Sequence, residues 1–483
     1  ERYPVQRGTY GMLQAPVLSS LLFANEVTSP FSPSAAKRSG SSPSTCTKPG
    51  RVYIYTRLIF EGEVSTIMSH ENFEKIGLPR IIEYDRQYKE SLQEAFEVYN
   101  DWVSQYEEQI LQQALMLAGR SELLEGWTSV NESIQNTERL ILSAIDEYYG
   151  GKINHAQNTI FQILSELIAN DSQNFLVSDI DKSYATRMVA PFPELHSKVI
   201  DYEKEYELMN HEELTFFRAR VSHVDGFQDM LHIPLSQRDA ISTQRFSVPG
   251  TPCLYLGTSS YDVWRELDRP AYCNFNVSAL KIKPQAQRQP IKILNLINSS
   301  YFMYGLVGIP TKESITRKTV DLICQQLQIW PFVCATSFKI KNSAKNFRSE
   351  YIISHLIMMS LQQLGIDGVA YTSNQLTPSE EPLAVPLMVN LALPVFSDSV
   401  SAKYGPICNH LLITDPVNFE EYQGLVLQDS DKNHNTSYFA KACKEPDYRP
   451  SIIYCKRGVH YRNTAFFKFD NFLCSQQFYE IEH

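Results

Sequence analysis

Three apolar stripes with helical spacing occupy the first half of the chain. The second stripe runs from Ile134 to Tyr148 and ends at a Gly-Gly pair, and the third runs from Ile153 to Ile168. The first stripe begins near residue 82, stops at Gly119, and consists of Tyr88, Leu92, Phe96, Tyr99, Val103, Tyr106 and Ile110. Residues that recur every three or four positions share one face of a helix. Three such helices with short breaks predict an antiparallel bundle or helical hairpin.

Beyond about residue 191 the pattern becomes mixed. The segment 215–221 alternates with period two, which predicts a strand with Arg218 and Arg220 on one face. Two arginines on one strand face either meet an anion or lie on the solvated side of a sheet. The two residues by themselves favour the solvated side.

A strand, a helix start and a further helix-to-strand unit follow. Residues 253–257 form a short apolar strand, and Ser259 or Ser260 is a suitable N-cap for a helix that carries Glu266. Farther on, 350–364 is an apolar helix that ends at a glycine, and 367–373 predicts a turn, a strand and an exposed Ser373. Polar side chains at the ends of strands are where ligands usually bind in such units.

Composition narrows the class of protein. The 483 residues are 43% hydrophobic and 12% aromatic, which is enough for a large core and excludes a fully disordered chain. A net charge of -10 argues against binding to a nucleic-acid backbone. Nine scattered cysteines without a CxxC predict reduced thiols in a cytosolic protein, and no apolar window is long enough for a membrane span.

Changes in composition and in the hydrophobic pattern along the chain predict four regions. Residues 1–80 form a leader and a Ser/Pro-rich linker that is partly disordered, and 81–180 form the helical module. Residues 205–400 form the mixed α/β region, and 401–483 form a β-rich extension packed on it. The helical module contains no catalytic constellation, so self-association or partner sensing is the function that the sequence permits there.

Several ordered segments resemble the RES family, which is named for an arginine, a glutamate and a serine. They are FRAR (217–220), HIP (232–234), QRFSVPGTPCLYLGTSSYDVWREL (244–267), EYIISHL (350–356) and GIDGVAYTS (365–373). The resemblance covers roughly 205–400. It implies an α+β protein in which an N-terminal helical module precedes an ADP-ribosyltransferase-like mixed β core with flanking helices. It also implies an enzyme that consumes NAD, by hydrolysis, by phosphorolysis or by transfer of ADP-ribose to protein.

The resemblance assigns site residues by position. Tyr255 and Glu266 match the strand tyrosine and the helix glutamate of the family, and the arginine is either Arg218 or Arg245. Ser373 matches a shorter motif. Ser247 and His232 are secondary candidates for NAD binding.

The chemistry of NAD cleavage suits these residue types. Loss of nicotinamide leaves an oxocarbenium-like ribose, which the Glu266 carboxylate would stabilise. A guanidinium fork at Arg218 or Arg245 would bind the two phosphates, Tyr255 would stack on nicotinamide, and Ser373 would hydrogen-bond the carboxamide or the ribose. The sequence has no GxGxxG, no GxxxxGK[ST] and no metal-binding signature, so NAD is expected as a substrate, with no cofactor and no metal.

Three functional hypotheses remain at this point. The first is a toxin-like NAD glycohydrolase or phosphorylase, the second a protein ADP-ribosyltransferase, and the third a non-enzymatic helical interaction protein. The small toxins of the family lack the helical module (81–180) and the C-terminal extension (401–483), which favours a larger regulated effector. Its expected partners are NAD, an antitoxin or regulatory protein and a second copy bound through the helical module, with no nucleic acid and no membrane, in the cytoplasm.

Overall fold

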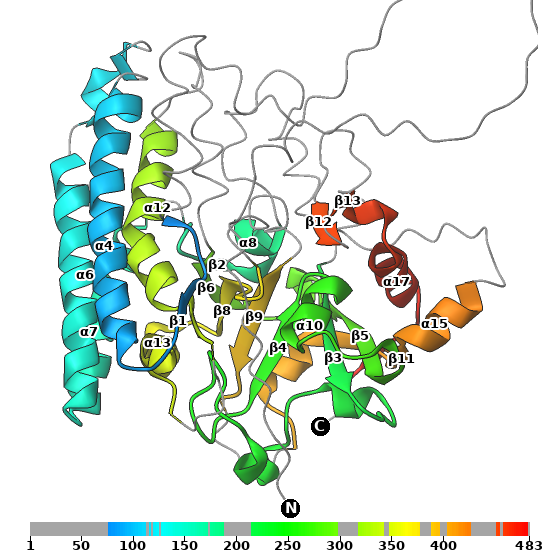
Figure 1. Cartoon of the computed structure of the whole chain (residues 1–483). Helices are drawn as coiled ribbons and strands as arrows, with labels where there is room; N and C mark the ends of the chain where they lie inside the picture. The colour runs from blue at the N-terminus through cyan, green and yellow to red at the C-terminus, as the bar shows by residue number, and fades with distance from the viewer. Residues whose placement is uncertain are drawn as a thin grey trace, which may run out of the picture. The chain divides into compact units, whose positions relative to one another are not determined.

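A computed structural model describes most of the chain beyond residue 75 (Figure 1). The described residues are 76–112, 115–116, 119–124, 127–171, 174–187, 214–297, 317–341, 347–376, 388–396, 403–426, 451–454 and 457–481. The predicted leader and linker lie outside them, except for 76–80. All described residues fall within the unit Arg51–His483.

Long helices stand side by side as one layer beside the sheet (Figure 1). They are α4 (Gln87–Tyr106), α6 (Trp127–Tyr149), α7 (Ile153–Ala169) and α12 (Arg317–Ala335), and the shorter α13 (Ile352–Leu364) packs against α7 and α12. The first three are the helices predicted for the helical module, and the described residues of their apolar stripes are mostly buried, although Ile153 is exposed. The layer also includes α12 and α13 from much later in the sequence, and α13 confirms the helix predicted over 350–364.

The first predicted helix begins later than its stripe suggested. Ile82 lies in the short strand β1 (Arg80–Ile82), which pairs in parallel with β7 (Phe338–Ile340). The β-branched residues there complete a strand pair rather than a helix turn. At its other end α4 continues as a π-helical turn over Glu107–Leu111.

A mixed sheet of ten described strands forms the centre, in the order β14-β10-β5-β3-β4-β9-β8-β6-β2, with β11 paired to β5. The strands are β2 Val177–Asp179, β3 Thr215–Val221, β4 Cys253–Gly257, β5 Phe275–Ile282, β6 Lys292–Leu296, β8 Gly368–Thr372, β9 Val389–Pro394, β10 Leu411–Thr414, β11 Val417–Asn418 and β14 Phe478–Glu480. The β6–β8 pair is parallel, and the other described pairs of this sheet are antiparallel. Together the helices and the mixed sheet confirm the predicted α+β class.

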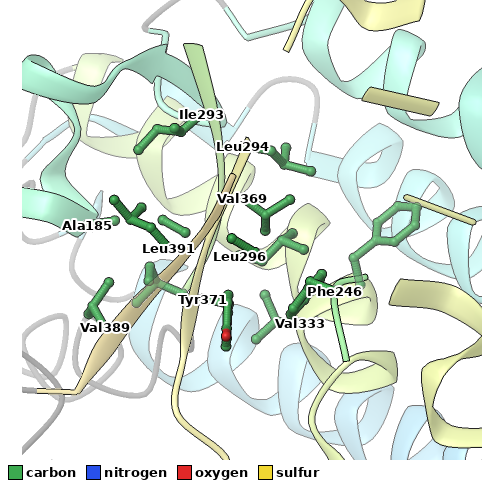
Figure 2. Close-up of a cluster of buried hydrophobic side chains, with 14 of the residues drawn as sticks. Ala185, Phe246, Ile293, Leu294, Leu296, Val333, Val369, Tyr371, Val389 and Leu391 are labelled. Carbon is green, nitrogen blue, oxygen red and sulfur yellow. The ribbon is translucent and has the colours of Figure 1, made fainter. Parts of the chain in front are cut away.

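The middle of the sheet is covered on both faces. Figure 2 shows Val333 of α12 beside Leu296 on one side, and Ala185 of α8 (Tyr184–Arg187) beside Leu391 on the other. Every residue of β8 and β9 is buried, and both strands are apolar apart from Tyr371, Thr372 and Asn390. No helix in the described part of the chain is long and apolar enough to cross a membrane.

The described part of the C-terminal region adds both strands and helices. Strands β10, β11 and β14 extend the sheet beyond β5, and β12 (Ser451–Tyr454) and β13 (Arg457–His460) form a separate pair. Two helices, α15 (Phe419–Val426) and α17 (Ala465–Cys474), belong to the same region.

The β-rich prediction for the aromatic stretch that starts at Phe466 is wrong for most of it. Helix α17 begins there because Thr464 caps it by accepting a hydrogen bond from the backbone N–H of Phe467 at 3.1 Å. Its buried residues include Phe466, Phe469 and Leu473, a helical spacing that the strand preference of the aromatic residues concealed.

Candidate active site

Glu266 lies at the end of a short helix that follows strand β4. Helix α10 (Ser260–Glu266) begins where the Ser259 hydroxyl accepts a hydrogen bond from the backbone N–H of Asp262, as the sequence predicted. Although Glu266 is an exposed residue, its Oε1 atom accepts hydrogen bonds from Ser373 Oγ and, at 3.2 Å, from Asn390 Nδ2. The carboxylate is therefore open to solvent but held at one oxygen.

Ser373 stands directly after strand β8, as predicted, but it is buried, so the prediction of an exposed serine is wrong. Gly365, with φ of 67°, ends helix α13 in the left-handed conformation that the turn into β8 requires. The Ser373 hydroxyl donates to Glu266 and accepts from the backbone N–H of Gln375 at 3.1 Å. Because a hydroxyl carries one hydrogen, this serine is committed to orienting the carboxylate.

Arg245 fills the space beside this pair. Both of its terminal nitrogens donate to the carbonyl of Thr372 at 3.3 Å, and its guanidinium lies 4.6 Å from the centre of the Tyr371 ring and 5.1 Å from that of Phe246. Burial lowers the pKa of Arg245, while Tyr371 and then Glu266 raise it. An arginine remains charged despite such shifts, so a half-buried cation stands near the Glu266 carboxylate.

Tyr255 and Ser247 form a second polar pair in the same cluster. The Tyr255 hydroxyl and Ser247 Oγ are 2.6 Å apart. Burial raises the pKa of Tyr255 well above its usual value, with Cys253 and Tyr371 adding to the effect, so the phenol is neutral. Burial also raises the pKa of Cys253 to about 12, which makes it a thiol rather than a thiolate.

Arg218 and Arg220 do not lie on a solvated face, which corrects the interpretation that their sequence alone favoured. Strands β3 and β4 pair at a single position, and the half-buried Arg218 guanidinium donates to the carbonyl of Tyr255 at 2.8 Å and to that of Leu231 at 3.3 Å. Arg220 donates to the same Leu231 carbonyl at 2.9 Å. Burial and then the neighbouring Arg220 lower the pKa of Arg218. Arg218 therefore adjoins the cluster through the backbone of Tyr255.

His232 braces a loop. It is 1% exposed; its Nε2 accepts from the backbone N–H of Gly405 at 2.9 Å, and its Nδ1 lies 2.8 Å from the carbonyl of Ile233. Burial lowers its pKa, so the ring is neutral. With both nitrogens engaged by backbone groups, His232 is not placed as a direct ligand contact.

The structure thus gathers most of the residues that the family resemblance singled out. Those that share one cluster are Arg245, Ser247, Tyr255, Glu266 and Ser373, with Arg218 beside it. Sequence reasoning missed Asn390, Tyr371 and Asp262. The sequence did contain a signal for Asn390, because it is the one polar residue in the buried strand VNLALP. Within the described residues, no group of three or more His, Cys, Asp or Glu side chains could hold a metal ion.

Comparison with known proteins gives a partial match. No family model matches the chain. A protein of Bacillus subtilis (strain 168), named "Putative toxin YopC", is 31% identical over 214 residues, which are 43% of this chain and 47% of that protein. The chain therefore spans about half the length of the curated relative it matches.

Among solved structures, the crystal structure of the M. tuberculosis MbcT-MbcA toxin-antitoxin complex matches at 14% identity. The match covers 44% of this chain and 88% of that chain, with a TM-score of 0.23, which is too low to carry an argument. The comparisons thus establish a likeness in sequence to a protein named as a toxin, and membership of the RES family stays a resemblance.

Proposed function

We propose that the chain is a toxin-like enzyme that cleaves the bond between nicotinamide and ribose in NAD. The observation that carries the proposal is the Glu266 carboxylate, fixed at one oxygen by Ser373 and Asn390 and placed near the Arg245 cation. The RES-like segments and the similarity to a protein named as a toxin support it.

The reaction needs a carboxylate in this situation. When the bond between C1′ and nitrogen breaks, the electron pair leaves with nicotinamide, and positive charge develops on the ribose. No described residue donates to Oε2 of Glu266, so this oxygen is available to the ribose, where its charge would stabilise the transition state. Water then adds to C1′ and releases a proton, giving ADP-ribose. Inorganic phosphate in place of water would give the phosphorylase product.

Two arginines are available for the phosphates. We assign Arg245 as the primary phosphate ligand, because it shares the cluster with Glu266 and its buried Nε has no hydrogen-bond partner. Arg218 is the second candidate, since its Nε is also without a partner and it binds the backbone of Tyr255. A guanidinium binds phosphate oxygens in two places at once, which a lysine cannot do. Tyr255 offers its ring to nicotinamide.

The test compares Glu266→Gln with the wild type. The purified full chain is incubated with NAD, and free nicotinamide is followed by chromatography. Glu266→Gln should lower the rate by about 100-fold or more, because it removes the charge but keeps the shape. Glu420→Gln, at an exposed position of α15, is the matched control and should leave the rate unchanged. A wild type that releases no nicotinamide, or a Glu266→Gln variant as fast as the wild type, contradicts the proposal.

Transfer of ADP-ribose to a protein is the second candidate. The exposure of Glu266 favours it, because an acceptor side chain from another molecule can reach a carboxylate that faces solvent. NAD labelled in the adenosine part separates the two reactions: label on a protein band indicates transfer, and label only in free ADP-ribose or its phosphate indicates hydrolysis or phosphorolysis.

A further inference from the structure

A buried carboxyl group lies directly behind Glu266. Asp262 stands one helical turn before Glu266 on α10 and is 0% exposed. Its Oδ1 accepts a hydrogen bond at 3.3 Å from Nδ2 of Asn390, the same nitrogen that donates to Glu266 at 3.2 Å. An amide nitrogen carries two hydrogens, so Asn390 can serve both carboxyl groups at once.

We propose that Asp262 and Asn390 are positioning residues that set the orientation of the Glu266 carboxylate. This inference rests on the proposed function, because it describes how the proposed catalytic residue is held. Asp262 fixes the Asn390 amide, and the amide fixes Oε1 of Glu266 together with Ser373. The other oxygen of Glu266 is thereby directed outward.

The sheet leaves the pair little freedom to move. In the strand register Asn390 lies opposite Gly257 of β4 on one side and opposite Tyr371 of β8 on the other. A Cβ atom at Gly257 would lie 2.7 Å from Oδ2 of Asp262 and 2.7 Å from a methyl carbon of Val263. The glycine therefore makes room for the Asp262 carboxyl, which is confined between α10, β4 and β9.

The electrostatics of the cluster favour the neutral form of Asp262. Burial raises the pKa of Asp262 well above its usual value, and the neighbouring Glu266 carboxylate adds to the shift. A neutral Asp262 avoids placing two negative charges next to each other at a position shielded from solvent. Its buried Oδ2 has no hydrogen-bond partner. A buried polar atom without a partner costs stability, so its presence here favours a role at the site over a purely structural one.

The experiment measures kcat and KM for nicotinamide release by full-length variants that thermal unfolding shows to be folded. Asn390→Ala should lower kcat by about 10- to 100-fold, with KM within about twofold, because it removes a hydrogen bond to a charged group. Asp262→Ala should lower kcat in the same way. Asp262→Asn keeps the shape and the acceptor oxygen, and should stay within about threefold of the wild type.

The outcomes separate this inference from the proposed function. If the wild type releases no nicotinamide, the proposed function is wrong, and this inference is wrong with it. An active wild type with an equally active Asn390→Ala variant overturns this inference alone. If Asn390→Ala does not fold, the Asp262 pair decides: equal kcat values for Asp262→Ala and Asp262→Asn overturn the inference, and rescue by the asparagine supports it.

Discussion

The helical layer and the cluster around Glu266 both bury aromatic rings, but they use them differently. In the layer the rings stack on each other, with Tyr99 and Trp330 3.8 Å apart and Trp102 and Tyr106 5.2 Å apart between ring centres. In the cluster Tyr255 binds a serine hydroxyl and Tyr371 lies against a guanidinium. The contrast teaches that burial in the layer serves stability, whereas burial at the strand ends holds charge and hydrogen bonds in fixed positions.

The contrast between the helical layer and the Glu266 cluster predicts that Trp330→Ala has the largest effect on the free energy of unfolding. Removing this fully buried ring leaves a cavity against Tyr99 and should lower the free energy of unfolding by about 3–5 kcal/mol. Denaturant unfolding measures the loss. Met116→Ala, at a side chain that is 68% exposed, is the control and should change stability by less than about 0.5 kcal/mol. A Trp330→Ala loss no larger than the control's would mean that the aromatic stack does not hold the layer together.

A buried acid lets the layer be tested through pH. Burial raises the pKa of Glu138 to about 8, partly offset by the hydrogen bond from Asn100. The folded protein therefore holds a proton on Glu138 that the unfolded chain releases near pH 4, so this residue's contribution to stability falls as pH rises from about 4 to about 8. Glu138→Gln should flatten that fall, by at most about 1.4 kcal/mol for each pH unit.

Urea unfolding at pH 5, 7 and 9 measures the Glu138 effect. Glu132→Gln, at an exposed position of the same helix, should keep the wild-type pH dependence. Helix α17, outside the layer, has its own buried acid, Asp470, whose pKa burial raises to about 7, with the same sign of effect between pH 4 and 7. Glu138→Gln should leave this second contribution in place. An unchanged pH dependence in Glu138→Gln would contradict the assignment.

A substitution in the Glu266 cluster should lower activity more than stability, whereas a substitution in the helical layer should lower stability. Ser373→Ala removes one of the two donors to Glu266 and should lower the rate of nicotinamide release by about 10-fold, which corresponds to about 1.4 kcal/mol. Its free energy of unfolding should change by about 1 kcal/mol or less. Ser475→Ala, at an exposed serine, is the matched control for both measurements. A Ser373→Ala variant that loses several kcal/mol of stability but no activity would erase the distinction between the two regions.

The sequence predicted the layer better than the cluster, for physical reasons. A helix stripe depends on neighbours three and four positions away, so Tyr88 to Tyr106 could be recognised from spacing alone. The bonds that make the site join Glu266 to residues 107 and 124 positions away, and no local pattern encodes such contacts. The family resemblance supplied the identities of Tyr255 and Glu266. It supplied neither Asn390 nor the backbone carbonyls that hold Arg218.

The smallest effect is expected for an ion pair on the surface of the layer. Lys89 of α4 and Asp146 of α6 approach to 2.6 Å, but their side chains are 34% and 61% exposed. Solvent and salt screen such a pair, so Lys89→Ala should lower the free energy of unfolding by less than about 1 kcal/mol, and less still in high salt. Denaturant unfolding at two salt concentrations measures this, with Lys468→Ala in α17 as a lysine control outside the layer. A loss of stability close to that of Trp330→Ala would show that polar contacts between helices, rather than the buried rings, stabilise the layer. The contrast between the layer and the cluster around Glu266 would then be wrong.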